Sequence, residues 1–134
     1  MDHENAPGRT EKLIRLAREK FGDELVLMID GNGTYSLEGA IRLGQILEEY
    51  NFYFYEEPVH WDWYEEQKRV AEALTIPMAG GEEEFGMHAF RWLIAHNAFE
   101  ILQPDTFYFG GMIRSMKVAR MAEAAGKVIV PHMS

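Results

Sequence analysis

The sequence contains no cysteine. Disulfide bonds and thiolate metal sites are therefore excluded, and a small secreted scaffold held by disulfides is not expected. Basic residues are scarce as well: 13 lysines and arginines stand against 22 aspartates and glutamates, for a formal net charge of −9. Because nucleic acids and anionic membranes are bound by basic surfaces, we expect neither as a partner.

Long apolar runs are missing too. The aliphatic run Leu25–Ile29 is far shorter than the roughly 20 residues of a bilayer-spanning helix. The segment Met1–Gly8 is polar and lacks the apolar core of a signal peptide. Over its 134 residues the chain is 47% hydrophobic and 26% charged, which is ordinary for a globular domain with its own core. We therefore expect a cytoplasmic protein.

Short apolar runs alternate with amphipathic segments along the chain. The apolar runs predict strands at 25–29, 52–55, 76–79, 99–102 and 128–130. The segments between them, and one before the first, predict helices at 10–21, 37–50, 62–74, 87–96 and 112–125. The first run is apolar throughout, which is typical of a strand buried on both faces. This alternation predicts an α/β fold with a parallel sheet.

Several polar residues and glycines mark predicted helix ends. Thr10 and Ser36 are predicted N-caps, Asp62 and Glu65 form a predicted capping box, and Gly22 ends the first helix. The inward face of that helix is predicted to be Leu13, Ile14, Ala17 and Phe21. Residues 1–9 are expected to be a flexible lead-in and residues 10–134 one domain.

Each predicted strand is followed by an ionisable residue. These residues are Asp30, Glu56, Glu82, Asp105 and His132, at spacings of 26, 26, 23 and 27 residues. A strand of about 5 residues, a helix of about 11–12 and two loops need roughly this much chain. The five side chains should therefore lie at one height and meet at the carboxyl end of a parallel barrel. Three carboxylates on successive strands suit a hard cation, with Mg²⁺ the best fit.

Each motif alone has a simpler interpretation. Asp30-Gly31-Asn32-Gly33 is usually a turn, and the run Glu82–Glu84 is usually a charged surface loop. Either Glu56 or Glu57 could be the ligand at the end of its strand. A lone histidine after proline, such as His132, is more often structural. It is the joint occurrence at regular spacing that favours a site.

Two further features of the sequence could have either a structural role or a role in substrate binding. Gly110-Gly111 can start a helix or present backbone N–H groups to a substrate carboxylate. Trp61 and Trp63 follow the second strand and can line a substrate site, although packing against a helix is the more common role.

Taken in order, these motifs resemble the mandelate racemase/muconate lactonizing enzyme branch of the enolase superfamily. The matching segments are Asp30-Gly31-Asn32, Phe54–Pro58, Gly80-Gly81-Glu82, Gln103-Pro104-Asp105 with Gly110-Gly111, and Pro131-His132. The resemblance covers residues 10–134 and implies a partial TIM-type (β/α) barrel of about five parallel strands.

The resemblance also implies roles for individual residues. Asp30, Glu56 and Glu82 would be the Mg²⁺ ligands, and Asn32, Gly110 and Gly111 would contact the substrate. His132 would be the general acid/base, with Asp105 orienting it. The implied reaction removes the proton alpha to the carboxylate of a sugar acid or 2-hydroxy acid through an enediolate. A dehydratase is favoured over a racemase, because racemisation needs a base on each face of the substrate and the chain offers one.

Parts of the family pattern are missing from this sequence. We expect the capping domain and the first and last barrel strands to be absent, and no lysine of the chain ends a predicted strand. The chain thus resembles a fragment that lacks the second base and the lid. A competing hypothesis is a catalytically incomplete, metal-binding half-barrel that associates into homo-oligomers, because an open sheet exposes two edges.

Overall fold

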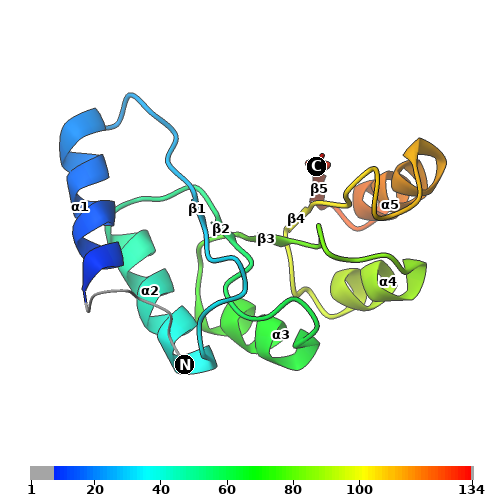
Figure 1. Cartoon of the computed structure of the whole chain (residues 1–134), viewed down its shortest axis with the longest axis horizontal. Coiled ribbons are helices and arrows are strands. Elements are labelled where there is room, and N and C mark those ends of the chain that lie inside the picture. Colours follow the sequence, from blue (N-terminus) through cyan, green and yellow to red (C-terminus); the bar gives the residue numbers. More distant parts are fainter. Residues whose placement is uncertain (1–7, 134) are drawn as a thin grey trace.

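The computed structural model describes residues 8–133. It contains one sheet of five parallel strands in the order β1-β2-β3-β4-β5 (Figure 1). The strands are β1 (Ile29–Asp30), β2 (Tyr55–Glu56), β3 (Met78–Gly80), β4 (Ile101–Leu102) and β5 (Val128–Ile129). The predicted α/β alternation with a parallel sheet is therefore confirmed. Of the predicted lead-in, residues 1–7 lie outside the described part of the chain.

Five helices follow the outer side of the curved sheet (Figure 1). They are α1 (Arg9–Phe21), α2 (Leu37–Glu49), α3 (Tyr64–Ala73), α4 (Met87–Ala95) and α5 (Met112–Ala124). This arrangement, with strands inside and helices outside, is that of a barrel over part of its circumference. No helix within residues 8–133 is both long and apolar enough to cross a bilayer.

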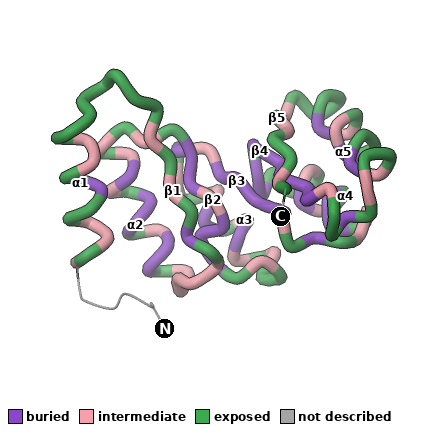
Figure 2. The backbone as a smooth tube through the Cα atoms, turned by 45° about the horizontal axis from the view of Figure 1, so that its top comes forward, coloured by how far each residue is buried: buried purple, intermediate pink, exposed green. Residues whose placement is uncertain are grey.

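The core lies mainly between the sheet and the helices. Tyr55 and Met78 are fully buried there, together with Leu47 of α2 and Leu93 of α4. Since neighbouring residues of a strand point to opposite faces, Phe54 faces the inner side, where it joins Ala79 and Ile101 in a smaller cluster. Figure 2 shows the buried positions concentrated in the middle of the sheet and the helix faces beside it.

The predicted burial of the first strand on both faces is wrong. Leu25, Val26 and Met28 are 49%, 67% and 50% exposed, and β1 begins only at Ile29. The reason is that β1 pairs with β2 alone in the described residues and so forms an edge of the sheet. A run of aliphatic residues predicts a strand, but its burial depends on neighbours that this sheet does not supply.

The prediction for the first helix is partly wrong. Its N-cap is Gly8, in the left-handed region with φ 73°, and Thr10 lies inside the helix. Ile14 of the predicted inward face is buried, but Leu13 and Phe21 are 60% and 50% exposed. The narrow buried face follows from the position of α1 at the end of the helix row, where it packs against α2.

The other predicted helix ends have mixed outcomes. Ser36 does cap α2, because its Oγ accepts a hydrogen bond from the N–H of Gly39 at 3.2 Å. Gly22 ends α1 as predicted, with φ 55°. The Asp62–Glu65 capping box is wrong: Trp63 is the N-cap of α3 without a side-chain bond, and the Asp62 carboxylate instead contacts Nδ1 of His60 at 2.5 Å.

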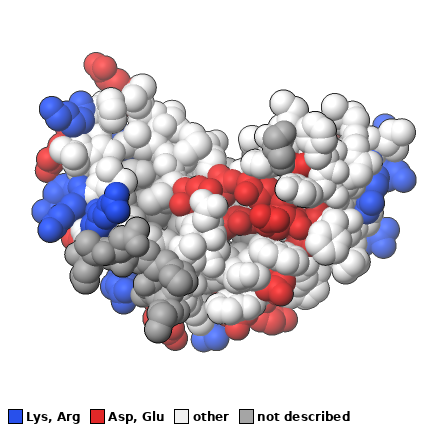
Figure 3. Space-filling model, viewed as in Figure 1, with Lys and Arg blue, Asp and Glu red and all other residues white. Residues whose placement is uncertain are grey.

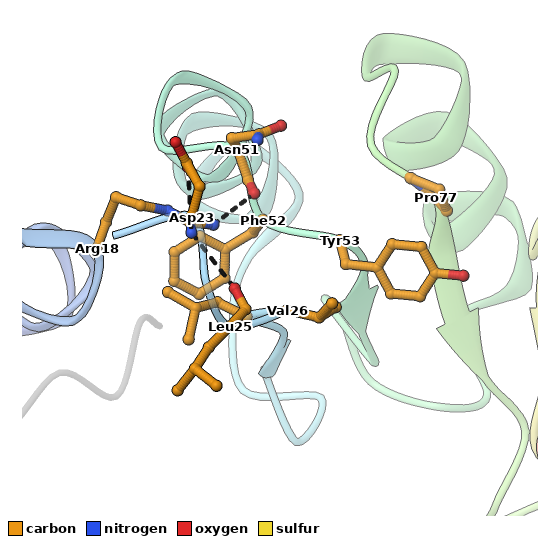
Figure 4. A pocket seen from close by; sticks show the side chains of 9 residues that line it. Arg18, Asp23, Leu25, Val26, Asn51, Phe52, Tyr53 and Pro77 are labelled. Carbon is orange, nitrogen blue, oxygen red and sulfur yellow. Dashed lines mark hydrogen bonds and ion pairs between the residues drawn. The ribbon is translucent and has the colours of Figure 1, made fainter. Parts of the chain in front are cut away.

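A hollow of about 340 Å³ lies at the amino ends of the strands, beside Val26, Tyr53 and Pro77 (Figure 4). The Arg18 side chain reaches its wall. Its guanidinium donates to the carbonyl oxygens of Tyr50 at 2.8 Å, Asn51 at 2.7 Å and Gly22 at 2.5 Å. These contacts tie α1 to the segment before β2, so Arg18 has a structural role at the end of the sheet opposite to the ionisable residues.

Candidate metal-binding and acid–base site

The register of the strands places the first two predicted ligands side by side. Asp30, the last residue of β1, lies directly opposite Glu56, the last residue of β2. The prediction that these two side chains share one height in the sheet is confirmed. The two residues share this height because each ends its strand and the two parallel strands are paired at their last residues.

Glu82 departs from this common height. The residue opposite Glu56 on β3 is Ala79, so Glu82 lies three residues farther along the chain. The backbone turns at Gly81, which has φ 108°, and the N–H of Glu84 donates to the Gly81 carbonyl at 3.2 Å. This turn brings the Glu82 side chain back toward Glu56, whose negative charge acts on it. A constant spacing therefore predicted the meeting of these side chains but not the loop that produces it.

Asn32 is directed at Asp30. One oxygen of the Asp30 carboxylate accepts the backbone N–H of Asn32 at 2.7 Å, and the other accepts its side-chain amide at 2.6 Å. Asn32 has φ 46°, a left-handed conformation that asparagine tolerates. The geometry shows that Asn32 orients the carboxylate of Asp30. Its contact with a substrate stays a prediction.

Asp105 and His132 form a hydrogen-bonded pair. Oδ2 of the fully buried Asp105 lies 2.7 Å from Nδ1 of His132. The other oxygen of Asp105 accepts the backbone N–H groups of Phe107 and Tyr108 at 2.6 and 2.9 Å. The hydrogen bond to Asp105 raises the pKa of the His132 imidazole. The carboxylate is thus fixed by the backbone on one side and fixes the imidazole on the other.

His132 also connects this pair to the predicted metal ligands. Its Nε2 lies 3.4 Å from the carboxylate of Glu82. Burial raises the pKa of Glu82, and the charges of Glu56 and Asp30 add to this, although His132 acts in the opposite direction. The five residues found from the strand ends therefore form one group. Figure 3 shows acidic side chains gathered in the hollow of the molecule between its two ends.

Glu57 is a further acidic residue of this group, and the sequence left its role open. It is 5% exposed and has a positive φ of 36°. Burial, together with the charges of Glu82 and Asp30, raises its pKa to about 8. A carboxyl group so placed carries its proton at neutral pH. Its position after Glu56 gave no signal of this burial.

The glycine pair lies directly before α5, and the two tryptophans lie between β2 and α3. The N–H groups of Gly110 and Gly111 donate to the carbonyl oxygens of Phe107 and Thr106 at 3.2 and 2.9 Å. Both donors are thus engaged at the start of α5, and their use for a substrate carboxylate stays a prediction. Trp61 packs edge-on against Phe85, with ring centroids 6.2 Å apart, and Trp63 is 48% exposed.

Within residues 8–133, no three acidic or histidine side chains are arranged so that they could hold a metal ion as they stand. The contacts above explain this, because Asp30 is held by Asn32 and Glu82 is directed at His132. The chemistry of the donor set still fits Mg²⁺. It consists of carboxylate oxygens from the ends of β1 and β2 and from the loop after β3, and their mutual repulsion is what a divalent cation would relieve.

Comparison with known proteins identifies the family. The family model described as "Enolase C-terminal domain-like" matches residues 1–134. The chain belongs to this family. The resemblance to the mandelate racemase/muconate lactonizing enzyme branch is therefore confirmed, and the five-stranded sheet is part of the barrel of this superfamily.

Among similar proteins is an arabinonate dehydratase of Saccharolobus solfataricus, 32% identical over 121 residues, which cover 90% of this chain and 32% of that protein. The structure of an L-talarate dehydratase from Polaromonas sp. JS666, complexed with Mg and L-glucarate, superposes with a TM-score of 0.88 at 30% identity, covering 98% of this chain and 37% of the other. The structure of a Streptomyces coelicolor racemase with bound magnesium superposes with a TM-score of 0.91 at 26% identity. The match covers 96% of this chain and 36% of the racemase. The chain thus spans about a third of the length of these proteins.

Proposed function

We propose that this chain provides the Mg²⁺ ligands and the acid–base pair of an active site that removes the proton alpha to the carboxylate of a sugar acid, most simply as a dehydratase. The observation that carries the proposal is the group Asp105–His132–Glu82 beside Asp30 and Glu56. Its support comes from the acid-sugar dehydratases among the similar proteins and from the magnesium in their structures.

Asp30, Glu56 and Glu82 would hold the cation. Mg²⁺ bound there would stabilise the negative charge that develops on the substrate carboxylate as the neighbouring proton leaves. Asn32 prepares this site by orienting the carboxylate of Asp30 with two hydrogen bonds. Glu57, held neutral by burial, limits the repulsion among the acids before the cation binds.

His132 would transfer the proton. Its Nδ1 is engaged by Asp105, which fixes the ring orientation and leaves Nε2 to exchange a proton with the substrate. The same hydrogen bond raises the pKa of His132 and so makes the neutral imidazole a stronger base. A dehydratase needs a base that removes the α-proton and an acid that expels the β-hydroxyl group. His132 could serve as either one.

A racemase or epimerase of the same family is the alternative reaction, and a magnesium-containing racemase is among the similar structures. It would need a second base on the opposite face of the substrate. The residues at the strand ends supply His132 on one face. The dehydratase reaction is therefore the one that these residues support better.

Exchange of the α-proton tests the proposal. The chain is incubated in D₂O with Mg²⁺ and a panel of sugar acids that includes glucarate, and deuterium incorporation is followed by NMR. We expect exchange that depends on Mg²⁺, that is abolished by His132→Asn and that is reduced by Asp105→Asn. Exchange that persists in His132→Asn would contradict the assignment of the base.

A second candidate function is a catalytically incomplete, metal-binding half-barrel that associates with itself. Exposed aliphatic side chains at the two edges of the sheet favour it: Val26, in the segment before β1, is 67% exposed, and Val128 of β5 is 51% exposed. Mg²⁺ binding without any α-proton exchange across the panel would support this candidate over the dehydratase.

A further inference from the structure

Arg114 joins two loops of the site that are distant in sequence. The acidic loop, residues 82–86, follows β3 and carries Glu82. The aromatic loop, residues 105–111, follows β4 and begins with Asp105. Arg114, in the first turn of α5, donates from Nη2 to the carbonyl oxygen of Phe85 at 3.0 Å, across 29 residues of sequence. The end of the acidic loop is thus held by a side chain that belongs to the helix after the aromatic loop.

The rings of Phe109 and Phe90 pack behind this contact. The guanidinium of Arg114 lies over the ring of Phe109, 4.7 Å from its centroid. Phe109 is fully buried and meets Phe90 edge-on, with centroids 4.9 Å apart and an interplanar angle of 79°. The Phe90 ring in turn lies beside Gly81, where an added Cβ would come within 2.9 Å of it. The stack therefore ends at the residue directly before Glu82.

The aromatic loop is fastened to Asp105 on its other side. The N–H of Phe109 donates to the carbonyl oxygen of Asp105 at 2.9 Å. The Asp105 carboxylate accepts from Phe107 and Tyr108 with one oxygen and contacts His132 with the other. A shift of the aromatic loop would therefore move Asp105, and His132 with it, relative to Glu82.

We propose that Arg114 is a positioning residue that holds the acidic loop against the aromatic loop and thereby sets the 3.4 Å separation between Glu82 and His132. The meaning of that separation for metal binding rests on the proposed function. The contact itself does not need a metal. Nothing places Arg114 against the reacting atoms, so it acts through Glu82 and His132.

An arginine suits this position better than a lysine. Its planar guanidinium can stack on the Phe109 ring and donate in its own plane to the Phe85 carbonyl at the same time. A lysine keeps the charge and one donor but cannot satisfy both contacts with the same geometry. Replacement of Arg114 by lysine should therefore retain part of the positioning of the two loops. Replacement by methionine, which keeps only an apolar stem, should retain none of it.

The test compares Arg114→Met and Arg114→Lys with Arg120→Met, a change at an exposed arginine of the same helix. In the metal-free chain, at fixed pH, we expect the ¹⁵N resonances of the His132 ring to shift in Arg114→Met, to shift less in Arg114→Lys and to stay unchanged in Arg120→Met. Thermal unfolding of each variant shows which of them are folded. If Arg114→Met does not fold, Arg114→Lys decides the question. Wild-type His132 resonances in the folded Arg114 variants would overturn the proposal.

Calorimetric titration with Mg²⁺ provides a second reading. Partners that orient a metal ligand typically contribute about 10–100-fold in metal affinity. We expect Arg114→Met to weaken binding by about 10-fold and Arg120→Met to leave it unchanged. If the wild-type chain binds no Mg²⁺, the proposed function fails, and the His132 resonances still decide whether Arg114 positions the two loops.

Discussion

At the scale of single residues, the site contains a carboxyl group whose pKa the fold raises. Glu57 is buried among the acids, and its pKa is raised from 4.5 to about 8. The unfolded chain releases this proton near pH 4.5 and the folded chain near pH 8. Between these values the folded state binds more protons, so the free energy of unfolding falls as pH rises.

Glu57→Gln should remove this dependence. In the wild-type chain we expect the group to lower the free energy of unfolding between pH 4.5 and pH 8, by up to about 5 kcal/mol for a shift of this size. The glutamine variant should show a flatter profile and be the more stable protein at pH 8. Urea denaturation at several pH values measures both. Parallel profiles of the two proteins would contradict the assignment of a buried, protonated Glu57.

Some side-chain contacts of the site could be predicted from the sequence, and others could not. Asp105 and His132 were paired through the family resemblance, and the 2.7 Å contact between them was found. Glu57 was considered only as an alternative ligand to Glu56, and Arg114 was not singled out. Their environments arise from contacts that are not visible in the local pattern, such as the burial of Glu57 and the reach of Arg114 to Phe85.

At the scale of elements, the helices were easier to predict than the strands. The amphipathic pattern placed α2 and α4 to within one residue at each end. The strands are shorter than their apolar runs. The first four lie at the carboxyl end of their runs, as β2 and β3 do, whereas β5 begins with its run. Strand limits are set by pairing with neighbours, and this pairing depends on the whole sheet rather than on the run itself.

The packing of α2 against α3 offers a test at this scale. Gly44 is buried in α2, and a Cβ at this position would overlap Cδ1 of Leu74. Gly44→Ala gains about 1 kcal/mol of helix propensity, but overpacking costs about 1–3 kcal/mol. We expect a net destabilisation of about 1 kcal/mol.

A double-mutant cycle with Leu74→Ala checks the cause. In that background the new methyl group has room, and Gly44→Ala should become neutral or stabilising in urea denaturation. If the two changes are additive, the close approach of Leu74 is not what makes glycine necessary at position 44.

At the scale of the whole molecule, the sheet is open and its outer strands are exposed. Val26 lies before β1 at one edge, and Val128 and Val130 lie at the other, 51% and 45% exposed. Exposed aliphatic strand edges favour pairing with another chain. The 134-residue chain alone is therefore expected to sediment as an oligomer at micromolar concentration.

Lysine at the edges should reverse this association. Val26→Lys and Val128→Lys place charges where another strand would pair, and we expect each to shift the sedimentation distribution toward monomer. Lys12→Ala, a change at an exposed residue of α1 outside the strand segments, serves as the control. A wild-type chain that sediments cleanly as a monomer at this concentration would contradict the prediction.

The central claim is that the acids at the strand ends form a Mg²⁺ site, and calorimetric titration of the chain with Mg²⁺ tests it most directly. We expect the wild-type chain to bind Mg²⁺. Glu56→Gln and Glu82→Gln should each bind it at least about 10-fold more weakly, because each removes a charged ligand. Glu83→Gln, whose side chain is exposed beside the site, should bind it as the wild type does. Equal affinity in all four proteins, or no binding by the wild-type chain, would contradict the account.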